Sequence, residues 1–150
     1  MPANNDPIFS KAADIQAAGP IVTVATSPYQ ASATIGTDIY KVFTADATNG
    51  GFVQRLRFKY VANATTTSVA CVAKVYISSA TSGAVTDANA WFFDEVALPA
   101  TGALTTTTTT PSYDVPFGFA LPAGYTILVK ITVGQSASTG WMCLAIAGKY

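Results

Sequence analysis

Apolar and polar residues alternate along most of the chain after residue 20, which is the pattern of half-buried β-strands. The clearest run covers residues 52–61, where Leu56, Phe58 and Tyr60 fall on one face of an extended chain, because successive side chains of a strand point to opposite sides. Shorter runs bounded by Gly, Pro, Asn or Ser predict further strands. About eight strands result, at residues 21–26, 37–44, 52–61, 68–78, 91–98, 113–120, 125–133 and 141–147.

Turn residues separate these runs and add detail to the prediction. The Asn-Gly-Gly sequence at residues 49–51 is typical of a hairpin turn between two strands. The Pro-Ala-Gly sequence at residues 122–124 predicts a turn with Gly124 at positive φ. Pro116 interrupts one run, which favours a position at a sheet edge. Six consecutive threonines at residues 105–110 fit either an exposed edge strand or a solvated loop.

The first 20 residues follow a different pattern and predict a short N-terminal arm or helix. Ile8 and Ile15 fall on one helical face, and a Gly-Pro pair at residues 19–20 would end the helix. So short a helix is marginal alone in water, and it needs a surface on its own domain or on a neighbour; a frayed terminus is the alternative. We therefore expect an arm at residues 1–20 and an all-β antiparallel β-sandwich, of jelly-roll type, at residues 21–150.

Composition narrows the class of function. Half of the residues are hydrophobic, only 11% are charged, and the net charge is zero, whereas soluble proteins carry about 25% charged residues. Such a neutral, hydroxyl-rich surface suits dense packing beside other proteins and gives no strong attraction for nucleic acid. No run of 18 apolar residues predicts a membrane span, and the first residues lack the features of a signal peptide. We expect folding in a cytoplasm, with neither nucleic acid nor membrane as a partner.

The two cysteines, Cys71 and Cys143, lie inside apolar runs that read as strands. Free cysteine behaves as a small core hydrophobe, so the sequence predicts a pair of buried thiols. A disulfide between neighbouring strands is the alternative, although a reducing compartment does not require one.

Residues suited to catalysis are scarce. Histidine is absent, which excludes Ser-His-Asp and Cys-His arrangements. The single glutamate, Glu95, follows Asp94 directly in an expected strand, so the two carboxylates should point to opposite faces. Oxygen ligands at residues 87–89 together with Asp94 match no EF-hand spacing and read better as an Asx-rich turn. We predict that the chain is not an enzyme and has no metal or cofactor.

Two groups of residues are candidates for partner binding. Arg55, Arg57 and Lys59 form a basic stripe opposite the apolar face of residues 52–61. A solvated sheet face, a protein partner or nucleic acid would each fit this stripe, and arginine is enriched at protein interfaces. The second group comprises the apolar residues of the arm. The full candidate set is Ile8, Phe9, Ile15, Arg55, Arg57 and Lys59.

Two segments carry a resemblance to a known class of proteins: LPAGYTILV at residues 121–129 and NGGFVQRLRF at residues 49–58. Together with the N-terminal arm and the charge-poor composition, they make residues 21–150 similar to phage virion β-sandwich proteins, such as capsid cement or decoration proteins and tail or fibre domains. The resemblance implies a trimeric structural protein of the virion that binds major capsid subunits. The alternative is a tail, fibre or carbohydrate-binding receptor-recognition module, with exposed aromatics near residues 79–89 and 134–140.

Overall fold

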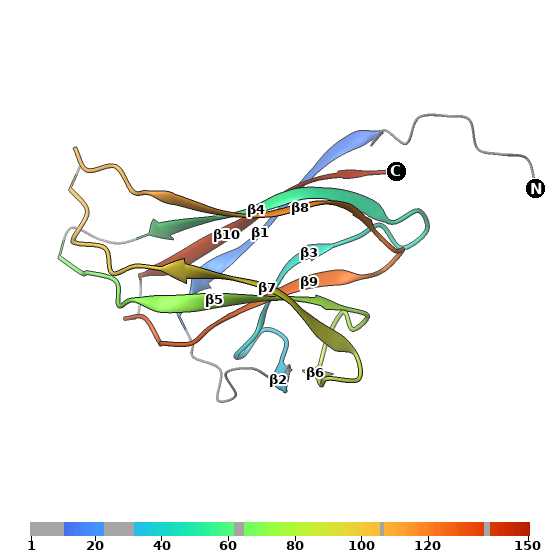
Figure 1. Ribbon diagram of the computed structural model, residues 1–150, viewed down its shortest axis with the longest axis horizontal. Coiled ribbons are helices and arrows are strands. Elements are labelled where there is room, and N and C mark those ends of the chain that lie inside the picture. Colours follow the sequence, from blue (N-terminus) through green and yellow to red (C-terminus); the bar gives the residue numbers. More distant parts are fainter. Residues whose placement is uncertain (1–10, 23–31, 62–64, 106, 137–138) are drawn as a thin grey trace, which may run out of the picture.

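The computed structural model describes residues 11–22, 32–61, 65–105, 107–136 and 139–150. Within these residues the chain forms ten strands and no helix. Two four-stranded sheets face each other, and a two-stranded sheet lies outside them (Figure 1). The pairings within each sheet are antiparallel. The predicted all-β, antiparallel class is therefore confirmed.

The first sheet has the order β1-β10-β4-β8. Its strands are β1 (Ala12–Ile21), β10 (Gly140–Lys149), β4 (Gly51–Val61) and β8 (Ser112–Leu121). The last strand in the sequence, β10, therefore lies between β1 and β4 in the interior of this sheet. Pro116 lies in β8, which is an edge strand, so the predicted edge position of this proline is confirmed.

The second sheet has the order β3-β9-β5-β7. Its strands are β3 (Tyr40–Thr44), β9 (Thr126–Ile131), β5 (Cys71–Ser78) and β7 (Ala90–Leu98). The small third sheet pairs the two-residue strands β2 (Ala33–Thr34) and β6 (Ala84–Val85). It lies beyond the outer side of the second sheet, away from the first one (Figure 1).

The long strands pair in a nested way. β1 pairs with β10, β3 with β9, β4 with β8, and β5 with β7. This is the pairing of one long hairpin, with its closed end between β5 and β7. Folding that hairpin over places alternate pairs in opposite sheets, so both sheets are built from distant parts of the sequence. The termini of the described chain meet at the pair β1 and β10.

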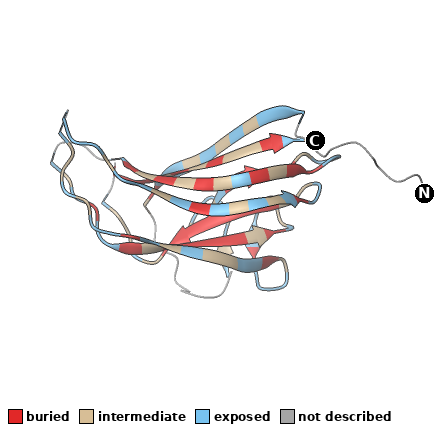
Figure 2. Cartoon of the chain, turned by 45° about the horizontal axis from the view of Figure 1, so that its top comes forward, coloured by how far each residue is buried: buried red, intermediate tan, exposed pale blue. Residues whose placement is uncertain are grey.

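The core lies between the two sheets. Leu56, Phe58 and Tyr60 on β4 are at most 3% exposed, which confirms the apolar face predicted for residues 52–61. The two cysteines are also buried between the sheets and are free, so the prediction of buried thiols is confirmed. Figure 2 shows the result along the strands, where buried and exposed segments alternate.

The predicted N-terminal helix is wrong, because residues 12–21 form β1 and pair with β10. The Gly-Pro pair at residues 19–20, read as a helix stop, lies inside this strand at an irregularity of the register. Tertiary pairing outweighs a helical pattern this short and weak. Ile8 and Phe9 lie outside the described residues, and the division into an arm and a domain at residue 20 stays a prediction.

One side chain joins β1 to the opposite sheet. The Gln16 amide donates to the carbonyl oxygen of Thr44 at 2.9 Å, and the Thr44 N–H donates to Gln16 Oε1 at 2.9 Å. The Gln16 amide thus makes the same pair of hydrogen bonds with Thr44 that a backbone peptide group of a neighbouring strand would make. It joins β1 to β3, which are the edge strands on the same side of the sandwich. These two hydrogen bonds close that side.

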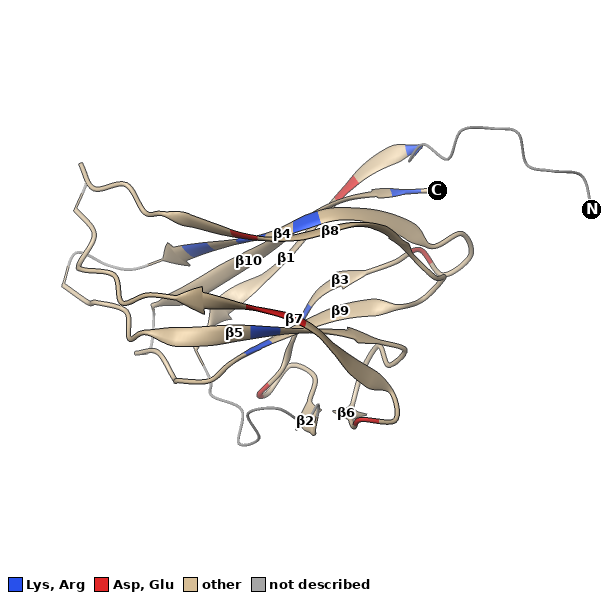
Figure 3. Ribbon diagram, viewed as in Figure 1, with Lys and Arg blue, Asp and Glu red and all other residues tan. Residues whose placement is uncertain are grey.

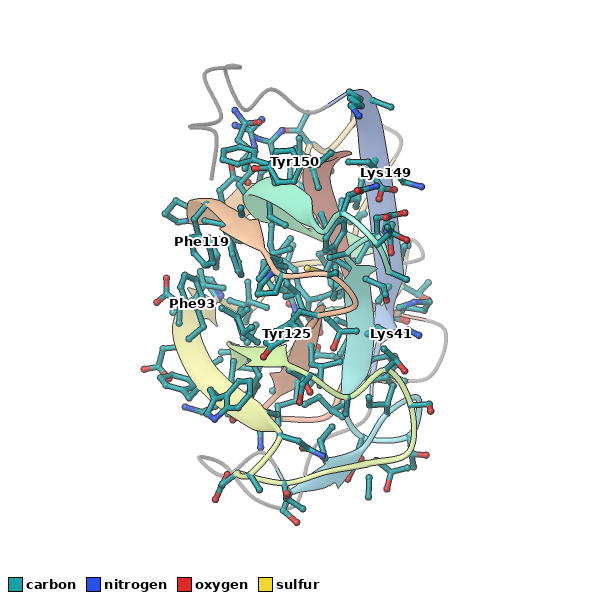
Figure 4. The ribbon with its side chains drawn as sticks, turned by 90° about the vertical axis from the view of Figure 1, so that its right-hand side faces the viewer. Lys41, Phe93, Phe119, Tyr125, Lys149 and Tyr150 are labelled. Atoms are coloured by element: carbon teal, nitrogen blue, oxygen red, sulfur yellow. The ribbon has the colours of Figure 1, made fainter. Side chains whose placement is uncertain are left out.

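The opposite side of the sandwich, between edge strands β7 and β8, is filled by aromatic rings. Phe93 of β7 stacks on Phe117 of β8 with ring centres 4.4 Å apart and meets Phe119 edge-on at 5.5 Å. Figure 4 shows Phe93 and Phe119 together on this side, and Lys41 and Lys149 on the other. The two sides are therefore closed by different chemistry, amide hydrogen bonds on one and phenyl packing on the other.

The turn predictions have mixed outcomes. Gly124 has φ 74°, so its predicted positive φ is confirmed. Residues 49–51 do not close a hairpin, because β3 and β4 belong to different sheets. The turn instead crosses between sheets, and a Cβ at Gly50 would collide with the carbonyl oxygen of Leu121. Thr105 and residues 107–110 lie outside any strand, which favours the loop for the threonine run.

Candidate functional site

The outer faces of the two main sheets differ in what covers them. The second sheet is covered by the third sheet and its loops, which bury a separate apolar cluster against β5 and β9: Ile39, Tyr76, Val85, Ala90 and Leu128. No comparable layer of described residues covers the outer face of the first sheet (Figure 1). The first sheet therefore offers the larger open surface, and the basic stripe of β4 lies on it.

Register places the side chains of this face in rows across four strands. One row runs from Ile15 through Ile146 and Arg55 to Pro116, and the next from Ala17 through Leu144 and Arg57 to Asp114. Lys59 follows on β4 opposite Met142. We call this surface the cationic face; its residues are Ile15, Ala17, Arg55, Arg57, Lys59, Asp114, Pro116, Met142, Leu144 and Ile146.

Asp114 is the only carboxylate of the cationic face. Arg57 donates two hydrogen bonds of 2.8 Å to Asp114, from Nε to Oδ1 and from Nη2 to Oδ2. These hydrogen bonds, and the charge of the guanidinium, lower the pKa of Asp114. The same hydrogen bonds, and the charge of the carboxylate, raise the pKa of Arg57. Figure 3 shows the basic segment of β4 beside the acidic segment of β8. The pair is a fixed, bidentate contact within the sheet.

Arg55 is less well satisfied than Arg57. Its Nε lies 3.6 Å from Asp114 Oδ2, which is an ion-pair distance but too long for a hydrogen bond. This Nε is buried and has no hydrogen-bond partner among the described residues. Lys59 instead donates to the carbonyl oxygen of Thr110 at 2.9 Å. The face thus carries three cations and one carboxylate, so two of its positive charges remain uncompensated.

The rest of the cationic face is apolar. Ile15 is 67% exposed, the highest value among the exposed large hydrophobic residues of the described chain. Leu144, Ile146 and Met142 of β10 are half-buried beside it. Scattered surface hydrophobics need no explanation, but apolar side chains that are contiguous and surround charged groups are typical of binding surfaces. The face therefore combines apolar side chains from β1 and β10 with guanidinium groups from β4.

The structure brings together four of the six predicted site residues. Ile15, Arg55, Arg57 and Lys59 lie on one face although β1 and β4 are far apart in the sequence. Ile8 and Phe9 lie outside the described residues. Sequence reasoning missed the contribution of β10, because residues 141–147 are apolar at both alternating sets of positions. That two-sided pattern was the available signal that one set of apolar side chains faces outward.

A second exposed group of residues lies on edge strand β7. Trp91 and Phe92 are 45% and 49% exposed, and Asp94 and Glu95 follow after Phe93. Glu95 Oε2 accepts a hydrogen bond of 2.6 Å from Lys74 of the neighbouring strand. We call Trp91, Phe92, Asp94 and Glu95 the β7 strip. The register on β5 places Trp91 and Asp94 on one face of β7 and Phe92 and Glu95 on the other. Figure 3 shows the acidic segment of β7 beside the basic segment of β5.

The covered side of the second sheet holds a buried lysine. Lys130 is 1% exposed, and its ammonium lies 5.0 Å from the centre of the Tyr76 ring. Burial, and then the charge of Lys74, lowers the pKa of Lys130. Burial also raises the pKa of Tyr76 to about 12. The third sheet and its loops cover this cluster, so it offers no open surface to a partner.

The described residues hold no group of three or more His, Cys, Asp or Glu side chains placed to bind a metal ion. They also contain no helix of the length and apolar character required to cross a membrane. Two exposed groups of residues stand out in the described part of the chain, the cationic face and the β7 strip.

Comparison with known proteins yields little. No model of a known protein family matches the chain, and no curated protein matches it. Among solved structures it is similar to a chain in "Structure of infectious bursal disease virus Gt strain", with 17% sequence identity and a TM-score of 0.25. The match covers 95% of this chain and 34% of that chain, so this chain spans about a third of it. A likeness with so low a TM-score identifies neither a shared fold nor a shared function.

Proposed function

We propose that this chain is a structural protein of a virion, one that works by assembly through the cationic face and not by catalysis. The single observation that carries the proposal is the outer face of the first sheet, which no layer of the described residues covers and where apolar side chains lie beside two arginines. Within the described residues, one sheet of the sandwich is covered by the third sheet and its loops and the other is open. An assembly surface fits this asymmetry.

The strand arrangement supports the structural role. Eight long strands pair first with last, second with second-last and so on inward, and we infer that this nested order is a jelly roll. Jelly rolls limit free sheet edges by stacking two sheets, and they are common in viral capsid and lectin domains. Proteins with the same fold can have different functions, so we infer the function from the chemistry of the cationic face.

The chemistry of the cationic face favours a protein partner over nucleic acid. A phosphate-binding surface needs several cations that are free to meet phosphates. Here Arg57 is held by Asp114 and Lys59 by a backbone carbonyl, while the surroundings are aliphatic. Arginine framed by apolar side chains is the composition of an interface centre. Ile15 is two-thirds exposed, and an exposed aliphatic side chain at this place favours contact with a partner over contact with water alone.

In detail, we propose a capsid decoration or cement protein that forms a trimer and binds major capsid subunits. The cationic face holds subunits together, and the predicted arm at residues 1–20 contacts the capsid. Each capsid contact can be weak, because many equivalent contacts across a lattice act together.

The experiment is quantitative mass spectrometry of purified virus particles from the source that encodes the chain. The proposal predicts the chain in a fixed ratio to the major capsid protein. Its absence from intact particles would overturn the proposal. Deleting residues 2–10, which leaves β1 whole, is expected to lower occupancy on particles; unchanged occupancy would reject the arm as the capsid contact.

Exposed aromatic rings on β7 favour a second candidate, a carbohydrate-binding receptor-recognition module. Trp91 follows the loop before β7 and stacks on Tyr125 with ring centres 6.2 Å apart, so one face of an exposed indole is held in place for a sugar ring. This candidate predicts hits on a glycan array that Trp91→Ala abolishes. An array without hits would reject it and leave the structural role intact.

A further inference from the structure

We propose that the free edge of β1 pairs antiparallel with β1 of a second copy of the same chain and joins the two copies into one continuous sheet. This inference goes beyond the proposed function, because it concerns the edge of the first sheet and not its outer face. β1 pairs with β10 on one side, and no described strand pairs with its other side. Figure 4 shows β1 along the margin of the sandwich, on the side of Lys41 and Lys149.

The free side of β1 offers a row of backbone groups to a further strand. The register with β10 is regular over the seven residues from Ala12 to Ala18, so this stretch keeps the extended geometry that a neighbouring strand requires. Alternate residues of an edge strand direct their N–H and C=O groups away from the sheet, and such a row is a template for pairing with another chain. Among the described residues, no side chain bonds to the backbone of this stretch. Another extended backbone is the chemistry that satisfies these groups.

The other three edges of the sandwich are interrupted or occupied. On β3, the N–H and the carbonyl oxygen of Thr44 already bond to a side-chain amide of β1. On β8, Pro116 has no N–H to donate, and Gly118 leaves strand geometry with φ 68°. On β7, the register with β5 shifts and the Glu95 N–H donates to the side chain of the residue before it. Sheet proteins use such devices to prevent edge pairing, so their absence from the backbone of residues 12–18 marks β1 as the edge open to a partner.

The side chains of β1 fit a second copy of the same strand. A two-fold axis at Ile15 places the Ile15 residues of the two copies opposite each other, Ala13 opposite Ala17, and Ala12 opposite Ala18. The small alanines let the strands approach closely, and the seven paired residues would exchange roughly six to eight backbone hydrogen bonds. Ile15 is 67% exposed in the single copy, and in the pair it packs against its equivalent as a cross-strand neighbour.

Charge does not oppose this pairing. Asp14 is the only charged residue of the stretch, and it accepts a hydrogen bond of 3.1 Å from Gln16 and lies 4.0 Å from the Lys149 ammonium. The cations of β4 are separated from the free edge by β10 and β1. In the joined sheet the two β4 strands would be about five strand spacings apart, roughly 24 Å, which exceeds the screening length of about 8 Å at physiological salt.

A contact of β1 with itself is isologous and closes after two copies. It therefore gives a pair and no larger ring, and in a trimeric assembly it would join a subunit of one trimer to a subunit of the next. Because the two-fold axis is perpendicular to the joined sheet, the cationic faces of both copies lie on the same side of it and stay open.

The test is disulfide crosslinking of the full chain through single cysteines on the exposed face of β1. Ile15→Cys should form a covalent dimer with itself, because directly opposite residues of an antiparallel pair lie within disulfide reach. Ala13→Cys and Ala17→Cys should crosslink when mixed but not alone, because each lies opposite the other and too far from its own equivalent. Cys71 and Cys143 are buried, so the unaltered chain should form no crosslink.

A charge at the centre of the pair provides the second arm of the experiment. Adding Ile15→Lys to both members of the Ala13→Cys and Ala17→Cys mixture places two lysines opposite each other, which should lower the yield of crosslinked dimer roughly tenfold. Val133→Lys alters an exposed residue outside β1, and as the matched control it should leave the yield unchanged.

Several results would overturn the inference. They are a mixture that does not crosslink, Ala13→Cys that crosslinks with itself, and a yield that Ile15→Lys does not change. The substituted positions are exposed, so each variant should fold, which circular dichroism checks. The reaction at residue 15 and the reaction between residues 13 and 17 are independent, so either one decides if a variant of the other fails to fold. A chain that is present in virus particles but forms no crosslink would overturn this inference alone and leave the proposed function standing.

Discussion

Replacing Gln16 with alanine should open the side of the sandwich between β1 and β3. The side chain makes two hydrogen bonds of 2.9 Å with the backbone of Thr44. A hydrogen bond contributes about 1 kcal/mol net, and more is lost when a partly buried partner is left unsatisfied. We therefore expect Gln16→Ala to lower the free energy of unfolding by about 2 kcal/mol, or the melting temperature by roughly 4–8 °C.

The local consequence should exceed the global one. Apart from Ile21, no residue of β1 is fully buried, so little apolar burial holds this strand once the bridge is gone. Urea unfolding gives the stability, and amide hydrogen exchange gives the local effect at the Thr44 N–H and along β1. Gln54→Ala, at an exposed position of β4, is the matched control and should change neither. A Thr44 N–H that exchanges as slowly in Gln16→Ala as in the unaltered chain would refute the reasoning.

Three further outcomes are expected. Gly50→Ala should destabilise the fold by roughly 1–3 kcal/mol, since φ is 78° and a Cβ has no room; in urea unfolding, an effect no larger than that of Gly102→Ala would contradict this. Burial raises the pKa of Cys71 to about 11 and that of Cys143 well above its usual value. Both thiols should therefore resist a thiol reagent until the protein unfolds. The free energy of unfolding should also fall as pH rises from 9 toward 11, because the unfolded chain loses these protons first. Asp114 has a lowered pKa in the folded protein, so its carboxylate contributes to the free energy of unfolding above pH 3.8. This contribution is lost as pH falls through the pKa of the folded state. In Asp114→Asn, the free energy of unfolding should therefore fall less steeply with decreasing pH.

Strands could be predicted from the sequence where one face of the strand packs in the core and the other faces solvent. Residues 52–61 are the best example, because charged and apolar side chains alternate from Arg55 to Tyr60. The same reasoning failed at residues 12–21, where alanines leave strand and helix periods nearly equal in strength. Pairing with β10 decides that segment, and a partner 120 or more residues away in the sequence leaves no local signal.

The candidate site shows a similar limit. Arg55, Arg57 and Lys59 were identifiable as a stripe from β4 alone, but the apolar part of the cationic face comes from β1 and β10. Only the register, with Ile15 opposite Ile146 and Ile146 opposite Arg55, joins these residues into one surface. Asp114, which neutralises part of the stripe, likewise comes from a distant strand. Such combinations depend on topology and cannot be read from a local pattern.

Hydroxyl-radical footprinting of the chain, free in dilute solution and incorporated in virus particles, tests the central claim most directly. Assembly through the cationic face predicts that oxidation of Ile15, Met142 and Leu144 falls on incorporation. Val69 and Val133, which are exposed elsewhere, should be oxidised to the same extent in both states. Equal oxidation of Ile15 in free and incorporated chains, or protection confined to Val69 and Val133, would contradict the account.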